Sequence, residues 1–560
     1  MLDELKKQLK DLLSFEVKLE FPPNKQMGDL AISCFDLAKE QQKNPVEIAD
    51  DLSQKIKSGN LELIENVESK GPYVNLFLST NVLAVKILEK IENNEKYGSN
   101  NLGKGKKVLI EYPSQNTHKE FHVGHLRNVC IGNVLVNLYK KSGYNVTPIN
   151  YINDFGAHVA KCLWGIQFLY NGKEPTENKQ EWLGKVYAEA TKEIGDDPAK
   201  KEDVAEIQRK LEAKFGDIYE LFQKTREWSM EGFNQIHKEL GVNHEQTFFE
   251  SDIKENGQKK VDELIEKGLA KSGEGGAIIA DLEKYGLDIA LLRKSNGAGV
   301  YMTSDLALAE LKKEKYPDID ESINITGVEQ NFYFKQLFKI LELSNFDFKM
   351  THIGYGLVNL PSGKMSSRKG NVILYKDVYE QVFEYLLNET KQRHIDWSEE
   401  KINENVKKLT LAGIKFSMQK HEASKNVVFN IEESAGISGY TGLYVLYTVA
   451  RINSILRKVE NINYQNKKSE LKENEEKVVL LKLSQYEDIC KKALEDYNPS
   501  VITRYCFELT SVFNDFYAKH RIVEAETEKL KVGRILLSTA VKNVLKNALE
   551  ILSIETVEEM

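Results

Sequence analysis

Residues 107–152 read KVLIEYPSQNTHKEFHVGHLRNVCIGNVLVNLYKKSGYNVTPINYI, and this stretch decides the fold. The apolar run at 107–114 predicts a short buried strand, and an irregular polar loop follows it. Apolar residues then recur at helical spacing over 124–143, up to a glycine that is typical of a helix end. Residues 144–152 predict another strand. This order of strand, crossover helix and strand predicts an α/β domain with a parallel, doubly wound sheet.

The composition is that of an ordinary globular protein. The chain has 560 residues, of which 41% are hydrophobic and 29% charged, so we expect roughly three or four domains. The formal net charge of −8 argues against a protein that coats nucleic acid nonspecifically. The sequence has no apolar run of the roughly 18 residues that a membrane span requires, and its first residues mix acids with lysines, unlike a secretory signal. We therefore expect a cytoplasmic protein without a membrane partner.

The five cysteines lie far apart in the sequence and form no C-x-x-C pair. An odd number of cysteines argues against a disulfide framework, and their spacing does not match a zinc site. We expect most of them to be small buried apolar residues, and we predict no metal site.

Changes of pattern divide the chain into successive parts. Residues 1–100 predict a small α+β domain. Residues 101–375 predict a Rossmann-like catalytic domain, in which the highly charged stretch at about 165–280 is interpreted as a helical insertion outside the sheet. Residues 376–435 predict connecting helices, and residues 436–560 predict an all-α bundle.

Two segments inside the sheet domain predict further strands. Residues 289–305, IALLRKSNGAGVYMTSD, favour two strands joined by an Asn-Gly turn. Residues 322–330, SINITGVEQ, favour a strand that ends in a functional loop.

The motif HVGH, residues 122–125, lies where the first strand of the sheet leads into its helix. A helix N-terminus presents unpaired N–H groups and a partial positive charge to phosphate. Gly124 lets a nucleobase or ribose approach the backbone, and the imidazoles of His122 and His125 can donate to a phosphate that gains charge in the transition state. The alternative is that the two histidines only cap the helix or bond to core carbonyls.

The segment SGKMSSRKG, residues 362–370, has a complementary character. Its cations Lys364, Arg368 and Lys369 are donors without acceptor capacity, and the flanking glycines permit movement. Such a loop can close over a polyphosphate, although a solvated basic turn is the alternative. Both motifs follow strands of one predicted sheet and can therefore reach one cleft. The sequence contains no G-x-x-x-x-G-K-[ST] pattern, which argues against a P-loop ATPase.

The pair H-x-G-H and K-M-S-x-x resembles the signature of class I aminoacyl-tRNA synthetases. Surrounding segments such as IEYPSQNTHKEFHVGHLRN, YINDFGAHVAK, TGVEQNFYFKQLFKIL and KMSSRKGNVI resemble the arginyl-tRNA synthetase branch, and the resemblance covers nearly the whole chain. It implies an arginine–tRNA ligase that activates L-arginine with ATP–Mg²⁺ and transfers it to the 3′ end of tRNA(Arg), without a tightly bound cofactor. The alternatives are a class I synthetase for another amino acid, a cytidylyltransferase-like enzyme, and a non-catalytic tRNA-binding paralogue.

An arginine site must pair a planar guanidinium with carboxylates, because its fork of donors matches them bidentately. By resemblance, Glu111 and Asp305 are these acids, and both are expected at strand ends. Tyr301 would shape the pocket between them. Asn116 and Gln330 are similar to the residues that hold the α-amino group.

The resemblance also implies residues for ATP and for catalysis. Glu329, next to Gly327, is similar to the acid that binds the ribose. The loop motif has Ser367 where a second lysine is common, and Lys119 matches a lysine thought to compensate. The implied catalytic set is His122, His125, Lys119, Lys364 and Arg368, and the implied ATP-binding set is His122, Gly124, His125, Gly327, Glu329, Val358, Lys364, Met365 and Ser366.

Other implications concern tRNA and one departure from the family. The N-terminal domain resembles a module that reads the tRNA elbow, the C-terminal bundle resembles an anticodon-binding domain, and family members commonly need bound tRNA to activate arginine. We expect a monomer. Tyr333 stands where the family often has His, which leaves the role of that side chain open. Candidate tRNA contacts, for each of which helix packing is the alternative, are Arg451, Arg457, Lys458, Arg504 and Tyr517.

Overall fold

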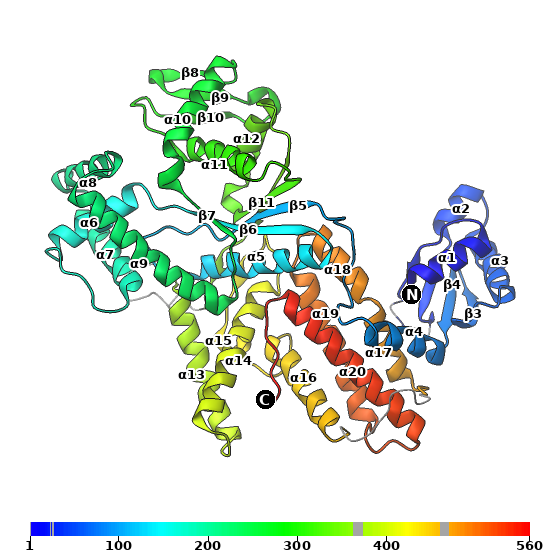
Figure 1. The fold of residues 1–560 in the computed structure, drawn as a ribbon. Coiled ribbons are helices and arrows are strands. Elements are labelled where there is room, and N and C mark those ends of the chain that lie inside the picture. The colour runs from blue at the N-terminus through cyan, green and yellow to red at the C-terminus, as the bar shows by residue number, and fades with distance from the viewer. Residues whose placement is uncertain (1, 23, 25–26, 362–372, 460–469) are drawn as a thin grey trace.

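The computed structural model describes residues 2–22, 24, 27–361, 373–459 and 470–560. An N-terminal α+β unit, a central parallel sheet with its helices, and a C-terminal helical region follow one another along the chain (Figure 1). The predicted fold class is therefore confirmed. Among the residues that the structure describes, no helix is both long and apolar enough to span a lipid bilayer.

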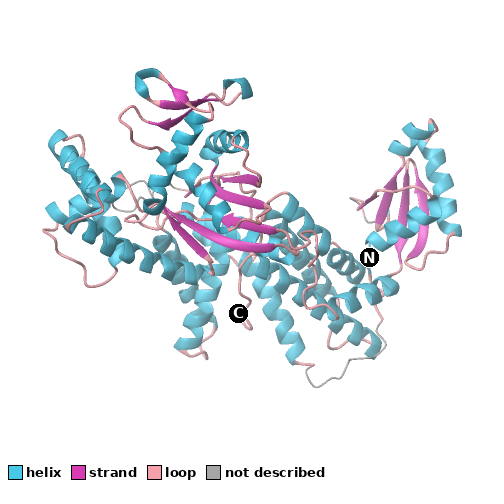
Figure 2. Cartoon of the chain, turned by 45° about the horizontal axis from the view of Figure 1, so that its top comes forward, coloured by secondary structure: helices cyan, strands magenta, loops and turns pink. Residues whose placement is uncertain are grey.

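The N-terminal unit is an antiparallel sheet with helices against it. The strand order is β1-β2-β4-β3, and this sheet stands apart from the other strands of the molecule (Figure 2). Helix α3 begins where the Asn44 side chain accepts the N–H of Val46, with Pro45 in the first turn. The bounds are α1 (Leu2–Leu13), β1 (Leu19–Glu20), β2 (Leu30–Ser33), α2 (Phe35–Gln41), α3 (Pro45–Ser58), β3 (Ile64–Lys70), β4 (Tyr73–Leu78) and α4 (Thr80–Glu92).

The central sheet has the order β12-β11-β5-β6-β7, and each neighbouring pair of strands is parallel. Helix α5 (Val123–Lys141) crosses from β5 to β6 as predicted. It is buried along most of its length because it contacts the sheet and also packs against helices of the C-terminal region. The strands are β5 (Lys107–Glu111), β6 (Asn145–Ile152), β7 (Gln246–Phe249), β11 (Glu321–Gly327) and β12 (Lys349–Tyr355).

The stretch 165–280 is only partly the helical insertion that the sequence favours. Four helices extend from the sheet as far as Leu240, but β7 then joins the edge of the central sheet, and a separate antiparallel sheet of β8, β9 and β10 follows. The stretch is helical again in α10, but it also contains β7, β8 and β9, which the sequence did not predict because such short strands carry little periodic signal between charged helices. The bounds are α6 (Ala157–Phe168), α7 (Lys179–Ile194), α8 (Pro198–Glu212), α9 (Asp217–Leu240), α10 (Glu250–Glu266), β8 (Lys271–Ser272), η2 (Glu274–Gly276), β9 (Ile278–Asp281), η3 (Glu283–Tyr285) and β10 (Ile289–Arg293).

The second strand predicted within 289–305 is in fact the start of helix α11 (Tyr301–Lys315). The N-terminus is capped because the Thr303 hydroxyl accepts the N–H of Val300 at 2.8 Å. Met302, Leu306 and Ala309 are buried on one face of this helix. Asp305 therefore lies one helical turn after Tyr301, not at a strand end.

After β11 the chain forms the edge strand β12 of the central sheet and then the helices of the C-terminal region. Helix α4 packs on α17 and α20, and Lys90 Nζ lies 2.5 Å from Glu487 Oε2, so the N-terminal unit is attached to the C-terminal region. The remaining bounds are η4 (Val328–Gln330), α12 (Asn331–Leu343), β13 (Val358–Asn359), α13 (Tyr375–Arg393), α14 (Glu399–Gln419), β14 (Val427–Val428), α15 (Ile431–Ser434), α16 (Gly442–Arg457), α17 (Asn474–Ser484), α18 (Tyr486–Glu495), α19 (Ser500–Lys519) and α20 (Glu528–Ile551).

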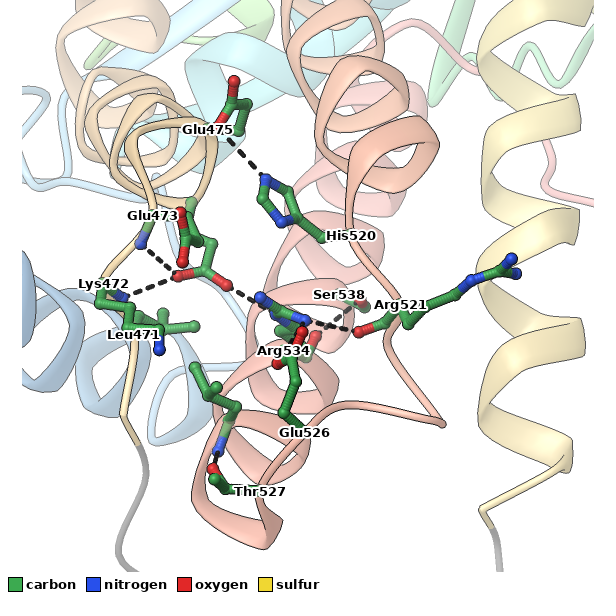
Figure 3. A network of polar contacts seen from close by, with 12 residues as sticks. Leu471, Lys472, Glu473, Glu475, His520, Arg521, Glu526, Thr527, Arg534 and Ser538 are labelled. Carbon is green, nitrogen blue, oxygen red and sulfur yellow. Dashed lines mark hydrogen bonds and ion pairs between the residues drawn. The ribbon is translucent and has the colours of Figure 1, made fainter.

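A buried ion pair joins two helices of this C-terminal region (Figure 3). Arg534 of α20 donates from Nε to Glu476 Oε1 of α17 at 2.7 Å, and both side chains are almost fully buried. The other Glu476 oxygen accepts the N–H groups of Lys472 and Glu473, at 2.8 and 2.9 Å. Arg534 also donates to the carbonyl of Arg521 at 2.7 Å. The pair is thus hydrogen-bonded on both sides.

Candidate active site

A cavity of about 610 Å³ lies at the carboxyl ends of β5, β6, β11 and β12. This is where ligands bind in doubly wound sheets. The cavity gathers the whole predicted arginine-binding set and four of the residues predicted for ATP. Those that line it are Glu111, Asn116, Tyr301, Asp305 and Gln330 from the first set, and His122, His125, Gly327 and Glu329 from the second.

His122 and His125 cap helix α5 and line the cavity at the same time. His122 is the N-cap residue, and its Nδ1 accepts the N–H groups of Gly124 and His125 at 3.1 and 3.3 Å. In return, His125 Nδ1 accepts the N–H of His122 at 3.4 Å. The rings stack with centroids 3.7 Å apart. Capping the helix and lining the cavity are therefore compatible roles for His122 and His125.

This capping fixes which ring nitrogen carries the proton. Because Nδ1 accepts a backbone N–H in each ring, a neutral imidazole carries its proton on Nε2. Burial and the nearby Lys119 ammonium lower the pKa of His122 to about 4. Burial and the His122 ring lower the pKa of His125 well below its usual value. At neutral pH both rings are uncharged donors.

Glu111 is the last residue of strand β5, and it pairs with the buried Lys312, which the sequence did not indicate. Lys312 Nζ lies 2.5 Å from Glu111 Oε2, and the two side chains are 1% and 5% exposed. Lys312 follows Asp305 by seven residues, so two turns of α11 place both on one face. The helical spacing would have indicated Lys312 if residues 301–315 had been recognised as a helix.

Asp305 adds a second carboxylate to the same cavity. Burial raises the pKa of Asp305 to about 7; a hydrogen bond from Tyr333 opposes that rise, Glu111 adds to it, and Lys312 opposes it. When Asp305 is ionised, Glu111 and Asp305 carry two negative charges against the single positive charge of Lys312. The local excess of negative charge is suited to a bound cation.

The other predicted cavity residues come from two loops. Gly327 is the last residue of β11, and Glu329 and Gln330 follow it in η4; a Cβ at position 327 would collide with the Glu329 carboxylate. Asn116 lies in the loop after β5 and forms an isolated bridge with Asn153, which follows β6. These polar groups surround the acids at the sheet edge.

Three predicted residues lie in places other than the wall of this cavity. The Lys119 ammonium lies 5.3 Å from the centre of the Tyr187 ring, in an adjoining cavity of about 680 Å³ that shares Asn116 and Tyr301 with the first. A Cβ at Gly124 would lie 2.9 Å from the His122 ring, so packing against that ring already requires glycine there. Val358 belongs to β13, which pairs with β14.

Four predicted residues lie outside the described part of the chain, namely Lys364, Met365, Ser366 and Arg368. Their assignments stay predictions. Within the described residues, no group of three or more His, Cys, Asp or Glu side chains could hold a metal ion.

The predicted tRNA contacts differ in their exposure and in their partners within the protein. Arg451 donates to Asn514 Oδ1 at 2.7 Å and lies over the rings of Tyr447 and Tyr517. Arg457 pairs with Glu559 at 3.4 Å. Arg457, Lys458 and Arg504 are exposed, and Tyr517 is 39% exposed.

Family models and curated relatives match nearly the whole length of the chain. Residues 1–78 match "Arginyl tRNA synthetase N terminal domain", residues 86–431 match "tRNA synthetases class I (R), catalytic domain", and residues 445–560 match "DALR anticodon binding domain". The arginine–tRNA ligase of Clostridium botulinum strain Alaska E43 is 33% identical over 98% of this chain and 97% of its own. That of Clostridium beijerinckii is 32% identical over the same shares.

Solved structures share the fold. The arginyl-tRNA synthetase of Thermus thermophilus superposes with a TM-score of 0.82 at 24% identity, covering 100% of both chains. That of Plasmodium falciparum gives a TM-score of 0.79 at 22% identity, covering 100% of this chain and 99% of its own. The resemblance seen in the sequence is confirmed, and the chain belongs to the arginyl-tRNA synthetase family of class I aminoacyl-tRNA synthetases.

Proposed function

We propose that this chain joins L-arginine to tRNA(Arg) in two ATP-dependent steps at the 610 Å³ cavity. The family supplies the reaction, in which the arginine carboxylate attacks the α-phosphate of ATP, pyrophosphate leaves, and the arginyl group then passes to the terminal ribose. The observation that carries the arginine assignment is the pair of acids Glu111 and Asp305 around a single buried cation, Lys312. A guanidinium supplies the missing positive charge and a fork of donors.

The histidines act in this proposal through their outer ring nitrogens. The first N–H groups of α5 donate to His122 Nδ1 and are therefore not free to bind phosphate. The Nε2–H groups of His122 and His125 take that role and stabilise charge that develops on the phosphate oxygens. Because both rings are neutral at pH 7, they donate hydrogen bonds without adding positive charge to the arginine site.

The remaining cavity residues hold the substrates in place. Glu329 and Gly327 would bind the ribose of ATP, and Asn116 and Gln330 would bind the α-amino group of arginine. Mg²⁺ would arrive as part of the ATP–Mg²⁺ substrate. Neither step requires a covalent bond to the enzyme, so positioning and charge stabilisation carry the reaction.

For tRNA, Lys458, Arg504 and Tyr517 are favoured over Arg451, which is hydrogen-bonded to Asn514, and Arg457, which is ion-paired with Glu559. Lys458, Arg504 and Tyr517 are accessible on the C-terminal bundle and suit contacts to RNA backbone and bases. Arg451 and Arg457 already have partners within the protein. We also infer action as a monomer in the cytoplasm, where tRNA, arginine and ATP meet.

The experiment that tests the proposal is ATP–pyrophosphate exchange with each amino acid, with and without tRNA(Arg). We expect exchange with arginine and no comparable exchange with glutamate, cysteine or lysine. A silent tRNA-binding paralogue would give no exchange under any condition, and exchange with another amino acid would contradict the arginine assignment.

A further inference from the structure

Tyr333 lies in the cavity wall but belongs to neither the HVGH motif nor the SGKMSSRKG segment. Tyr333 lies in the first turn of α12 and lines the cavity. Its hydroxyl donates a hydrogen bond to Oδ2 of Asp305 on α11. By resemblance, His is common at this position in the family, so this chain has a phenol donor there instead of an imidazole.

We propose that Tyr333 is a positioning residue for arginine, and that its hydroxyl holds the Asp305 carboxylate in the orientation in which it binds the guanidinium. This inference rests on the proposed function and assigns a role to a residue that departs from the family pattern. Tyr333 acts through Asp305 and is not itself assigned a contact with the reacting atoms.

The geometry supports this role in two ways. The hydroxyl occupies one carboxylate oxygen of Asp305, so the other oxygen remains for the substrate. The phenol ring is itself held in place: it stands perpendicular to Phe334, with centroids 5.4 Å apart, and packs on an apolar cluster to which α11 and α12 contribute. A donor that is fixed before the ligand arrives loses little conformational entropy on binding.

The charges around Asp305 give the hydrogen bond a second effect. Burial raises the pKa of Asp305 to about 7, and the Tyr333 hydroxyl is the largest influence in the opposite direction. The phenol remains a donor over the working range, because burial and Asp305 raise the pKa of Tyr333 well above its usual value. The groups that face Asp305 are Glu111 of β5, Tyr151 of β6, Glu250 of α10, Lys312 of α11 and Tyr333 of α12.

A histidine at position 333 would not be equivalent to tyrosine. Its nitrogens lie closer to the backbone than the phenol oxygen does, and an imidazole changes its charge near pH 6.5. A protonated ring would place another positive charge beside Asp305, where the guanidinium binds. Tyrosine supplies the donor without that competing charge.

The test uses the full-length enzyme and measures aminoacylation at saturating ATP and tRNA(Arg) together with arginine binding by calorimetry. For Tyr333→Phe we expect about a tenfold rise in both the arginine KM and the arginine Kd, with kcat within about twofold of wild type. The KM should also begin to rise at a higher pH than in the wild type as the solution is acidified, because losing the donor raises the pKa of Asp305. A packing role alone would not move that profile.

Tyr170→Phe is the matched control. The Tyr170 hydroxyl also donates to a carboxylate, Glu189 Oε2 at 2.6 Å, but it lies among the α6–α9 helices away from the cavity. We expect this variant to keep the arginine KM and its pH profile. Tyr333→His gives a second probe, whose arginine Kd should improve toward wild type only as the pH rises above the imidazole pKa.

An unchanged arginine Kd and pH profile in Tyr333→Phe would overturn the inference, as would a lower kcat at unchanged Kd. If Tyr333→Phe fails to fold, Tyr333→His decides, and a wild-type Kd at every pH would overturn the role of the phenol. If the wild type binds arginine but forms no arginyl-tRNA(Arg), the proposed function fails, while the Kd comparison still tests Tyr333.

Discussion

Two buried ion pairs in this chain, Glu476–Arg534 and Glu111–Lys312, differ in the balance of charge around them. Glu476 and Arg534 lie in the C-terminal region, where one buried negative charge meets one buried positive charge and backbone groups satisfy both side chains (Figure 3). The only other acid paired with Arg534 among the described residues is the exposed Glu526, at 3.8 Å. Glu111 and Lys312 are almost as fully buried, but they line a cavity with two further acids, Asp305 and Glu329. The first pair is electrically balanced, whereas the second leaves negative charge unpaired when Asp305 is ionised.

Local charge balance, rather than burial, separates a structural ion pair from a binding site. Both pairs have nearly no solvent exposure, so burial alone does not separate them. A balanced, hydrogen-bonded pair leaves nothing for a ligand to neutralise. An excess of one charge beside unfilled volume gives a ligand of opposite charge a favourable place.

Arg534→Met should have the largest effect. Removing the cation leaves Glu476 buried without its partner, which should lower the free energy of unfolding of the C-terminal region by about 3–5 kcal/mol. Urea denaturation, with hydrogen exchange of α17 and α20 to localise the change, measures this loss. The arginine KM of the folded enzyme should not change.

Arg209→Met is the control for that variant. Arg209 and Glu202 form an exposed pair at 2.8 Å, and losing it should leave the free energy of unfolding nearly unchanged. Equal losses in the two variants would mean that the buried pair has no special structural role.

Asp305→Asn should have the largest effect on the cavity side. Without its charge, arginine binding should weaken by about 2 kcal/mol or more, which is a KM about 30-fold higher, while the KM for ATP stays the same. Stability should not fall, because the variant removes a buried carboxylate that Glu111 repels. Steady-state aminoacylation and thermal unfolding measure the two quantities.

The exposed acid Asp318, which pairs with Lys107 at 3.0 Å, gives the matched control Asp318→Asn. It should leave both KM values unchanged. An arginine KM unaffected by Asp305→Asn would remove Asp305 from the pocket.

Lowering the pH should weaken arginine binding by a smaller factor. The pKa of Asp305 is raised to about 7, so this carboxyl becomes protonated as the pH falls from 8 to 6, and the arginine KM should rise about tenfold over that range. The profile should be nearly flat in Asp305→Asn. An unchanged wild-type KM between pH 8 and pH 6 would contradict the proposed charge state.

The effect of the same group on stability has the opposite sign. The folded chain without arginine holds this proton more tightly than the unfolded chain, whose aspartates titrate near pH 3.9. The contribution of Asp305 to stability is therefore fully present below about pH 4 and is lost as the pH rises through about 7. Asp305→Asn should remove this part of the pH dependence of unfolding.

Lys119→Ala should have the smallest effect, because this cation belongs to neither pair and its ammonium lies over Tyr187 in the adjoining cavity. If Lys119 compensates for the missing lysine of the loop motif, the variant should lower kcat for adenylate formation by about three- to tenfold at an unchanged arginine KM. Lys161→Ala, in the same cavity, should leave kcat unchanged. A raised arginine KM with normal kcat would instead place Lys119 in amino-acid binding.

The sequence could predict the part of the fold that carries long periodic signals. Strand β5, helix α5 and strand β6 follow the pattern of residues 107–152 closely. Helix α11 was missed because its first residues follow an Asn-Gly turn and alternate like a strand, and the Thr303 cap that starts it depends on local geometry. Strand β7 was missed because four residues are too few to show a period.

The candidate site was predictable only in part. Its acids were found by family resemblance, because two carboxylates among 85 acidic residues carry no signal of their own. Lys312 is likewise one of 77 Lys and Arg residues, and its pairing with Glu111 requires helix α11 to be known. The tautomer of the histidines follows from hydrogen bonds that no sequence pattern records.

We attribute the selection of a guanidinium to the unpaired negative charge at Glu111 and Asp305. Citrulline tests it most directly, because it has the length of arginine but a neutral end group. In ATP–pyrophosphate exchange with tRNA(Arg) at pH 8, we expect the wild type to prefer arginine over citrulline by about 1,000-fold or more in kcat/KM. Asp305→Asn should reduce that preference by about 30-fold or more. Equal use of the two amino acids by the wild type, or the same preference in Asp305→Asn, would contradict the claim.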